Sequence, residues 1–110
     1  MAATEDYDDL WLSSLLASRD STARTPLHMA ARQGHVEVCE LLMARGADVL
    51  APEGHGAPPL VLASFEGHED VVRSLLRGRA QVKQGDYKGR NAFHVAPQRT
   101  VLLKAVWVLK

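Results

Sequence analysis

The sequence predicts an all-α solenoid of stacked helix-turn-helix units with projecting β-turn fingers. Two observations lead to this prediction: the chain repeats itself every 33 residues, and each copy has room for two short helices with a glycine between them. Helices this short are not stable alone in water, so neighbouring copies must bury each other's apolar faces. One stack accounts for all 110 residues, because the chain is too short for two ordinary domains.

The repeat becomes visible when residues 20–52 are placed over residues 53–85. Nine of the 33 aligned positions are identical without any gap, where average composition would give about two. A third copy begins at Asp86, and Gly89, His94 and Ala96 fall in its register. The identical pairs are Pro26/Pro59, Leu27/Leu60, Ala30/Ala63, Gly34/Gly67, His35/His68, Val38/Val71, Leu42/Leu75, Ala47/Ala80 and Val49/Val82. The predicted units are an N-terminal tail and capping helix (1–19), repeat 1 (20–52), repeat 2 (53–85) and a degenerate or truncated repeat 3 (86–110).

Each copy is predicted to form a turn, a helix, a second turn, a second helix and a loop. In the first copy Thr25 is an N-cap candidate, and Pro26 suits the first helical position, where its missing N–H costs nothing. Gly34 then ends this helix, because glycine readily adopts the left-handed conformation that reverses the chain. Residues 48–57 contain one proline and two glycines, which predict an extended finger with a turn. The second helix has an apolar stripe that needs a partner, formed by Val38, Cys39, Leu42 and Met43 in copy 1 and by Val71, Val72, Leu75 and Leu76 in copy 2.

Ahead of the repeats, residues 5–18 predict an amphipathic helix that caps the N-terminal end of the stack. Trp11, Leu12, Leu15 and Leu16 share one face, and acidic residues crowd the N-terminal end, where the helix dipole favours them. Terminal units of repeat proteins are commonly atypical, because one of their faces meets water. We therefore expect Trp11 to pack in the cap rather than to anchor a partner.

Three motifs of the first copy indicate a family. They are Thr25-Pro26-Leu27-His28-Met29-Ala30-Ala31, Gly34-His35-Val36-Glu37-Val38 and Gly46-Ala47-Asp48-Val49. Together with the 33-residue period, they make the chain resemble the ankyrin repeat from Asp20 to about Lys110. The resemblance implies an intracellular, non-enzymatic module that binds another protein as an adaptor or regulator. It also implies that His28 and His94 are structural and bond backbone in the neighbouring turn.

Two positions depart from the repeat. Arg79 stands where copy 1 has Gly46, and because a left-handed arginine costs about 1–2 kcal/mol we expect Gly78 to make that turn instead. Pro97 falls inside the first helix of the third copy, where proline removes a hydrogen bond and disfavours helical geometry at Ala96.

The end of the chain is apolar on all sides. Val101–Leu109 holds eight apolar residues and one lysine, so whichever face packs on repeat 2, another stays exposed. The sequence predicts that this segment contacts a partner, self-associates with a second copy of the chain, or forms a poorly ordered tail.

Charge is balanced overall but uneven along the chain. The 13 basic and 13 acidic residues cancel, yet residues 73–110 hold nine basic residues and one acidic residue, a net +8. A basic segment can follow nucleic-acid phosphates, which makes nucleic-acid association the alternative function. An ordinary solvated face is the favoured interpretation, because no aromatic residues alternate with these bases.

Composition excludes several other kinds of function. The single cysteine, Cys39, leaves no disulfide framework and fits a reducing cytoplasmic or nuclear setting. Met1–Arg19 carries acids where a signal peptide would carry bases, and no apolar run approaches the roughly 20 residues that cross a membrane, so we expect neither secretion nor membrane spanning. The five histidines follow the repeat and form no metal-ligand motif, and Cys39 lies on an apolar stripe, so we expect no catalytic residue, metal or cofactor.

The predicted working surface consists of fingertips and exposed positions of the first helix in each copy. These positions differ between copies, while the packing positions repeat. Aromatic residues on a surface rich in charge favour a contact site over an ordinary solvated face. The predicted partner-binding residues are Arg32, Gln33, His55, Phe65, Glu66, Tyr87, Lys88 and Arg90.

Overall fold

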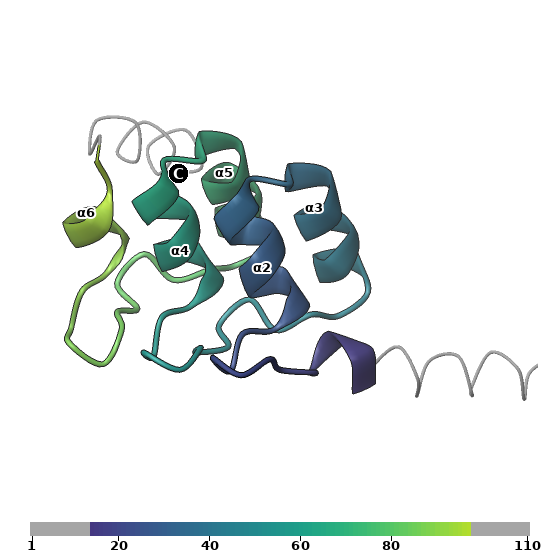
Figure 1. Ribbon diagram of the computed structural model, residues 1–110. Helices are drawn as coiled ribbons and strands as arrows, with labels where there is room; N and C mark the ends of the chain where they lie inside the picture. The colour runs from purple at the N-terminus through teal and green to yellow at the C-terminus, as the bar shows by residue number, and fades with distance from the viewer. Residues whose placement is uncertain (1–13, 98–110) are drawn as a thin grey trace, which may run out of the picture.

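The computed structural model describes residues 14–97, which form two layers of short helices above a row of fingers (Figure 1). One layer holds α2, α4 and α6, the other holds α3 and α5, and the fingers extend from the lower edge. Residues 14–97 contain no β-strand, which agrees with the predicted all-α solenoid. The helices are α2 (Pro26–Gln33), α3 (Val36–Ala44), α4 (Pro59–Glu66), α5 (Glu69–Arg77) and α6 (Ala92–Val95).

Helix α2 begins and ends where its sequence predicts. The Thr25 hydroxyl accepts from the backbone N–H of His28, while the His28 ring accepts from the backbone N–H of Thr25, so each residue satisfies a donor of the other. Gly34 ends the helix with φ 78°, and Gly67 ends α4 with φ 77°. A Cβ at Gly34 would also lie 2.7 Å from the His68 ring, so this position needs glycine for space as well as for conformation.

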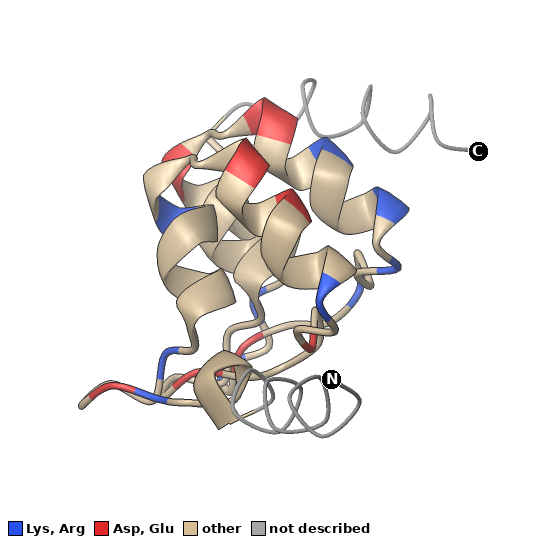
Figure 2. Ribbon diagram, turned by 90° about the vertical axis from the view of Figure 1, so that its right-hand side faces the viewer, with Lys and Arg blue, Asp and Glu red and all other residues tan. Residues whose placement is uncertain are grey.

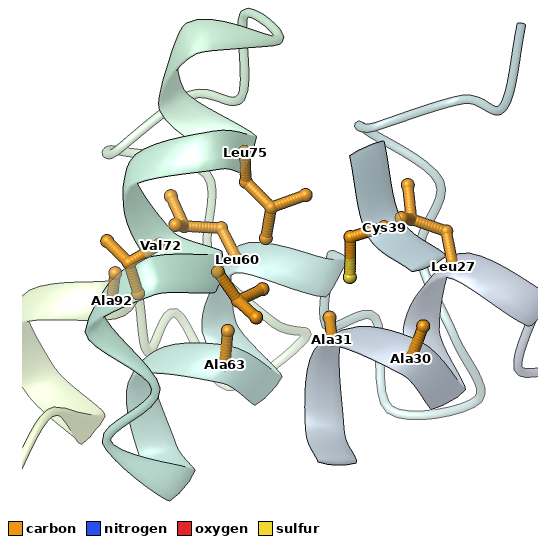
Figure 3. Close-up of a cluster of buried hydrophobic side chains, with 10 residues drawn as sticks. Leu27, Ala30, Ala31, Cys39, Leu60, Ala63, Val72, Leu75 and Ala92 are labelled. Atoms are coloured by element: carbon orange, nitrogen blue, oxygen red, sulfur yellow. The ribbon is translucent and has the colours of Figure 1, made fainter. Parts of the chain in front are cut away.

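One continuous core joins the two layers (Figure 3). Leu27 of α2 and Cys39 of α3 face Leu60 of α4 and Leu75 of α5, and all four are almost completely buried. Alanines fill the narrow spaces where neighbouring helices approach, and Ala92 extends the core to α6. Because burying one leucine side chain stabilises a fold by about 1.5–3 kcal/mol, these few side chains account for much of the stack's stability.

The same helix positions are buried in repeat 2 and exposed in repeat 1. Val71 and Ser74 of α5 are buried beneath α3, whereas the equivalent Val38 and Leu41 of α3 are 47% and 54% exposed. Within residues 14–97 nothing covers that side of α3. Trp11 and Leu12 of the predicted cap lie outside the described residues. Residues 14–16 are helical, and of the two remaining apolar positions Leu16 is buried while Leu15 is 46% exposed.

The turn after α5 differs from the prediction. Arg79, not Gly78, adopts the left-handed conformation, with φ 74°. The backbone N–H of Ala80 donates to the Leu75 carbonyl at 2.9 Å, as Ala47 donates to Leu42 in repeat 1, and this shared pattern assigns the left-handed place to position 79. Gly78 serves packing instead, because a Cβ there would lie 2.6 Å from the Met43 sulfur.

Helix α6 is one turn long because of Pro97. The helix ends at Val95, and Ala96 is extended, with φ −66° and ψ 126°, as predicted for a residue that precedes proline. The apolar segment Val101–Leu109 lies outside the described residues. No helix within residues 14–97 is long and apolar enough to cross a bilayer.

Candidate binding surface

Each finger is held in shape by one acidic residue at its base. Asp20, Glu53 and Asp86 occupy the same place in the repeat, and each accepts the backbone N–H groups two and four residues further along, over 2.7 to 3.1 Å. One carboxylate thereby satisfies two amides of a tight turn. The third position after each acid has a positive φ, and it is a glycine in the second and third fingers but Ala23 in the first.

These hydrogen bonds control how the acids titrate. Burial works to raise the pKa of the Glu53 carboxyl, but the amides of Ala57 and His55 outweigh it and hold that pKa below its ordinary value. Burial also works to raise the pKa of Asp86, but hydrogen bonds from the backbone and side chain of Arg90 outweigh burial and lower that pKa. Both acids therefore remain charged at neutral pH and keep their amide partners.

Adjacent fingers are joined to one another through the backbone. Gly54 N–H donates to the Thr22 carbonyl at 2.9 Å, and Tyr87 N–H donates to the His55 carbonyl at 2.9 Å. The Tyr87 ring lies against Gly56, whose φ of 82° and closeness to the ring leave no room for a Cβ. The fingers thus form one hydrogen-bonded row and not three separate loops.

His28 fastens this row to the helices. Its Nδ1 accepts from Thr25 N–H at 3.0 Å, so the proton lies on Nε2, which donates to the Ala57 carbonyl of the second finger at 3.0 Å. Burial lowers the pKa of His28, which keeps the ring neutral. The prediction of a structural histidine is confirmed for His28. His94 accepts from Asn91 N–H at 3.0 Å but bonds no neighbouring turn within residues 14–97. His68 makes a similar contact between repeats, with Nε2 3.0 Å from the Arg32 carbonyl.

A groove runs along the layer of α2, α4 and α6 and reaches the finger row. This groove, called the inner groove below, has a volume of about 270 Å³. Apolar side chains and charged side chains both line it, so it offers contact area together with polar groups. Its apolar residues are Ala57, Val61, Leu62, Phe65 and Val95, and its polar residues are Arg24, Arg32, Glu53, His55, Glu66, Asp86 and Arg90.

The structure brings together most of the predicted partner-binding residues. All eight are exposed. Five of them line the inner groove: Arg32, His55, Phe65, Glu66 and Arg90. Gln33, Tyr87 and Lys88 lie outside it, at the end of α2 and on the third finger.

Sequence reasoning missed Arg24, although a signal for it was present. Arg24 occupies the same repeat position as Arg90, which was predicted. In the structure Arg24 Nε lies 3.7 Å from Glu53 Oε2, and Arg90 Nε donates to Asp86 Oδ2 at 2.9 Å. Applying the 33-residue register to every predicted site residue would have added Arg24.

Cys39 is fully buried, and burial raises the pKa of its thiol to about 11, so the nucleophilic thiolate is strongly disfavoured. Among residues 14–97 no three His, Cys, Asp or Glu side chains are grouped closely enough to hold a metal ion.

Comparison with known families matches the ankyrin repeat profile to residues 23–53 and 55–87, more than half of the chain. The chain belongs to the ankyrin-repeat family. Ankyrin repeats are protein-interaction modules, which agrees with the groove and the finger row described above.

Its relatives include ankyrin-repeat segments of much longer proteins. Over 105 residues, 87% of the chain, it is 36% identical to the probable E3 ubiquitin-protein ligase XBOS33 of Oryza sativa subsp. japonica, of which the match covers 20%. Over 73 residues, 66% of the chain, it is 44% identical to the E3 ubiquitin-protein ligase XBAT33 of Arabidopsis thaliana, with 14% of that protein covered. Over 90 residues, 82% of the chain, it is 33% identical to the human transient receptor potential cation channel subfamily A member 1, with 8% covered. The chain therefore spans a fifth or less of the length of these relatives.

Proposed function

We propose that this ankyrin-repeat chain is a non-enzymatic adaptor or regulator that binds a partner protein through the inner groove and the finger row. The observation that most supports this is an aromatic side chain left uncovered within the groove: Phe65 is 63% exposed. Tyr87, 77% exposed on the third finger, offers a second aromatic contact. Exposed aromatic residues are enriched at the centres of protein interfaces.

The shape of the surface supports the same proposal. The volume of the groove, about 270 Å³, is smaller than the roughly 300–1,000 Å³ typical of pockets that enclose small molecules. The hydrogen-bonded finger row beside it extends the contact surface beyond the groove. A lone buried thiol without a disulfide partner fits a reducing compartment, and we place the binding in the cytoplasm or nucleus.

A comparison of captured proteins tests this function. Tagged wild-type chain, the double variant Phe65→Ala/Tyr87→Ala and the control Leu41→Ala are incubated with cell extract, and the bound proteins are quantified by mass spectrometry. Leu41 is a matched control because it is a large apolar residue, 54% exposed, on α3 outside the groove. Circular dichroism confirms that all three chains are folded.

We expect the double variant to lose proteins that the wild type and Leu41→Ala both retain, each by about tenfold or more, the loss that truncating hot-spot residues causes. Full retention by the double variant would refute this assignment of the surface. Retained nucleic acid whose binding falls with salt would instead favour association through the basic C-terminal third.

A further inference from the structure

We propose that the inner groove binds an extended peptide segment in which an acidic residue lies about three positions from an apolar one. This inference rests on the proposed function and adds the chemistry of the partner. It follows from which hydrogen-bonding groups of the groove are already used, and from how Arg32 and Phe65 are spaced.

The acceptors of the groove are largely consumed inside the protein. Of its three carboxylates, Glu53 and Asp86 have side chains only 1% and 4% exposed. Glu53 accepts from two backbone amides and lies 3.3 Å from His55 Nδ1, while Asp86 accepts from two amides and from Arg90 Nε. Glu66 alone among these three carboxylates faces solvent.

The donors of the groove are largely unused. Each guanidinium carries five N–H donors. Among residues 14–97, the Arg32 side chain makes no hydrogen bond or ion pair, and Arg90 uses only Nε. Arg24 Nε is buried 3.7 Å from Glu53 Oε2, so only the rest of that guanidinium can face a ligand. The groove therefore presents guanidinium donors to a ligand and few acceptors. A carboxylate is the group of a protein partner that satisfies them best, because its paired oxygens match the guanidinium fork.

An apolar group must lie beside that carboxylate. Phe65 is exposed in the groove, and Val61, Leu62 and Val95 complete its apolar lining. An aliphatic or aromatic side chain placed there would remove this surface from water at about 25 cal/mol per Å². A purely acidic ligand would leave this apolar surface exposed to water.

The repeat fixes the spacing between the two contacts. Arg32 and Phe65 occupy equivalent positions of α2 and α4, which pack side by side in one layer (Figure 1). Packed helices lie about 8–10 Å apart, and an extended chain advances about 3.3 Å per residue. About three residues of extended peptide therefore separate the acid at Arg32 from the apolar residue at Phe65.

The charge pattern of the rest of the molecule limits where such a ligand can go. Acidic residues occupy the first turns of α3 and α5, Glu37 in one and Glu69 and Asp70 in the other, at the top of the molecule in Figure 2. An acidic peptide is repelled there. At the finger end the groove has Arg24 and Arg90. Arg32 lies in the last turn of α2, at the end of the helices where these acids stand.

Selection from a library of random twelve-residue peptides displayed on phage tests the proposal. The full-length chain, Arg32→Glu and Phe65→Ala are used as targets, with Arg77→Glu as the matched control. Arg77 is an exposed arginine of α5 outside the groove, so its reversal changes the net charge equally. Thermal unfolding of each target confirms that it is folded.

Three results together would support the proposal. Peptides enriched on the wild type carry Asp or Glu about three positions from Leu, Ile, Phe or Trp. Arg32→Glu lowers the affinity of the chain for the enriched peptides by about tenfold or more, and Phe65→Ala lowers it by a similar factor. Arg77→Glu leaves their affinity within about twofold, because exposed distant charges are screened.

Other outcomes distinguish failure of the proposed ligand chemistry from failure of the proposed binding surface. Enriched peptides that are basic or neutral, or that tolerate Arg32→Glu, overturn this inference while a loss with Phe65→Ala still supports the proposed surface. Enrichment that both variants leave unchanged, or no enrichment at all, overturns the inference and counts against the groove as the binding surface. If instead a short duplex DNA binds the chain in a salt-dependent way and Arg77→Glu weakens it, the partner is nucleic acid.

Discussion

Replacing His28 tests how the finger row is fastened to the helices. The ring is completely buried, and the two backbone groups that it pairs, Thr25 N–H and the Ala57 carbonyl, belong to residues only 6% and 4% exposed. His28→Ala leaves the Thr25 N–H without a partner, at about 1–3 kcal/mol, and opens a cavity where the ring was. The Ala57 carbonyl loses one of its two donors but still accepts from the Glu53 N–H at 3.0 Å. We expect the free energy of unfolding to fall by about 2–4 kcal/mol, a large part of the 5–15 kcal/mol that holds an ordinary domain.

Urea unfolding followed by circular dichroism measures this loss, and His94→Ala is its control. His94 accepts from Asn91 N–H at 3.0 Å, the bond that His28 makes with Thr25, but His94 is exposed and has no finger beyond it within residues 14–97. We expect His94→Ala to cost no more than about 1 kcal/mol. A loss below about 1 kcal/mol for His28→Ala, or equal losses for the two variants, would refute the reasoning that the bond to the next finger stabilises the stack.

Three further predictions concern Arg79, Cys39 and the pH dependence of stability. Arg79→Gly should raise the free energy of unfolding by about 1 kcal/mol, because glycine adopts the left-handed conformation without penalty, and a decrease in urea unfolding would contradict this. Cys39 should react with a thiol reagent at about pH 8 only as fast as the fold opens, so immediate stoichiometric labelling of the native chain would be inconsistent with its burial and with a thiol pKa of about 11. The fold lowers the pKa of both His28 and Glu53, so the unfolded chain binds more protons than the folded chain in acid. The free energy of unfolding should therefore decrease as the pH is lowered, first below the ordinary histidine value of 6.5 and then below the ordinary glutamate value of 4.5. Melting temperatures measured from neutral to acidic pH should show both losses, and a profile flat down to about pH 4 would exclude them.

Features set by local chemistry could be predicted from the sequence. Thr25 caps α2 and Gly34 ends it because each acts on backbone within a few residues of itself. Pro97 ends α6 for the same kind of reason, since its ring restricts the residue before it. The 33-residue period then supplied the stacking, because it showed which faces recur.

Features set by contacts between repeats could not be predicted in this way. Gly78 looked like the turn residue, but its lack of a side chain makes room for Met43, more than 30 positions earlier. Arg24 joins the inner groove because Glu53 of the next repeat lies beside it. The sequence showed which residues are exposed. Which of them line the same groove depends on how neighbouring repeats are positioned against one another in the stack, and the sequence does not show this.

The acid at the base of each finger has a consequence for redesign. Asp20, Glu53 and Asp86 hold their turns through backbone amides. The side chains that add to these bonds are the hydroxyl of Thr22, the ring of His55 and the guanidinium groups of Arg24 and Arg90. The other tip side chains are therefore nearly independent of the loop's shape, as in a scaffold that displays variable peptides. New binding specificities can be grafted at these positions, provided that the acid and the left-handed residue three positions after it, Ala23, Gly56 or Gly89, are kept.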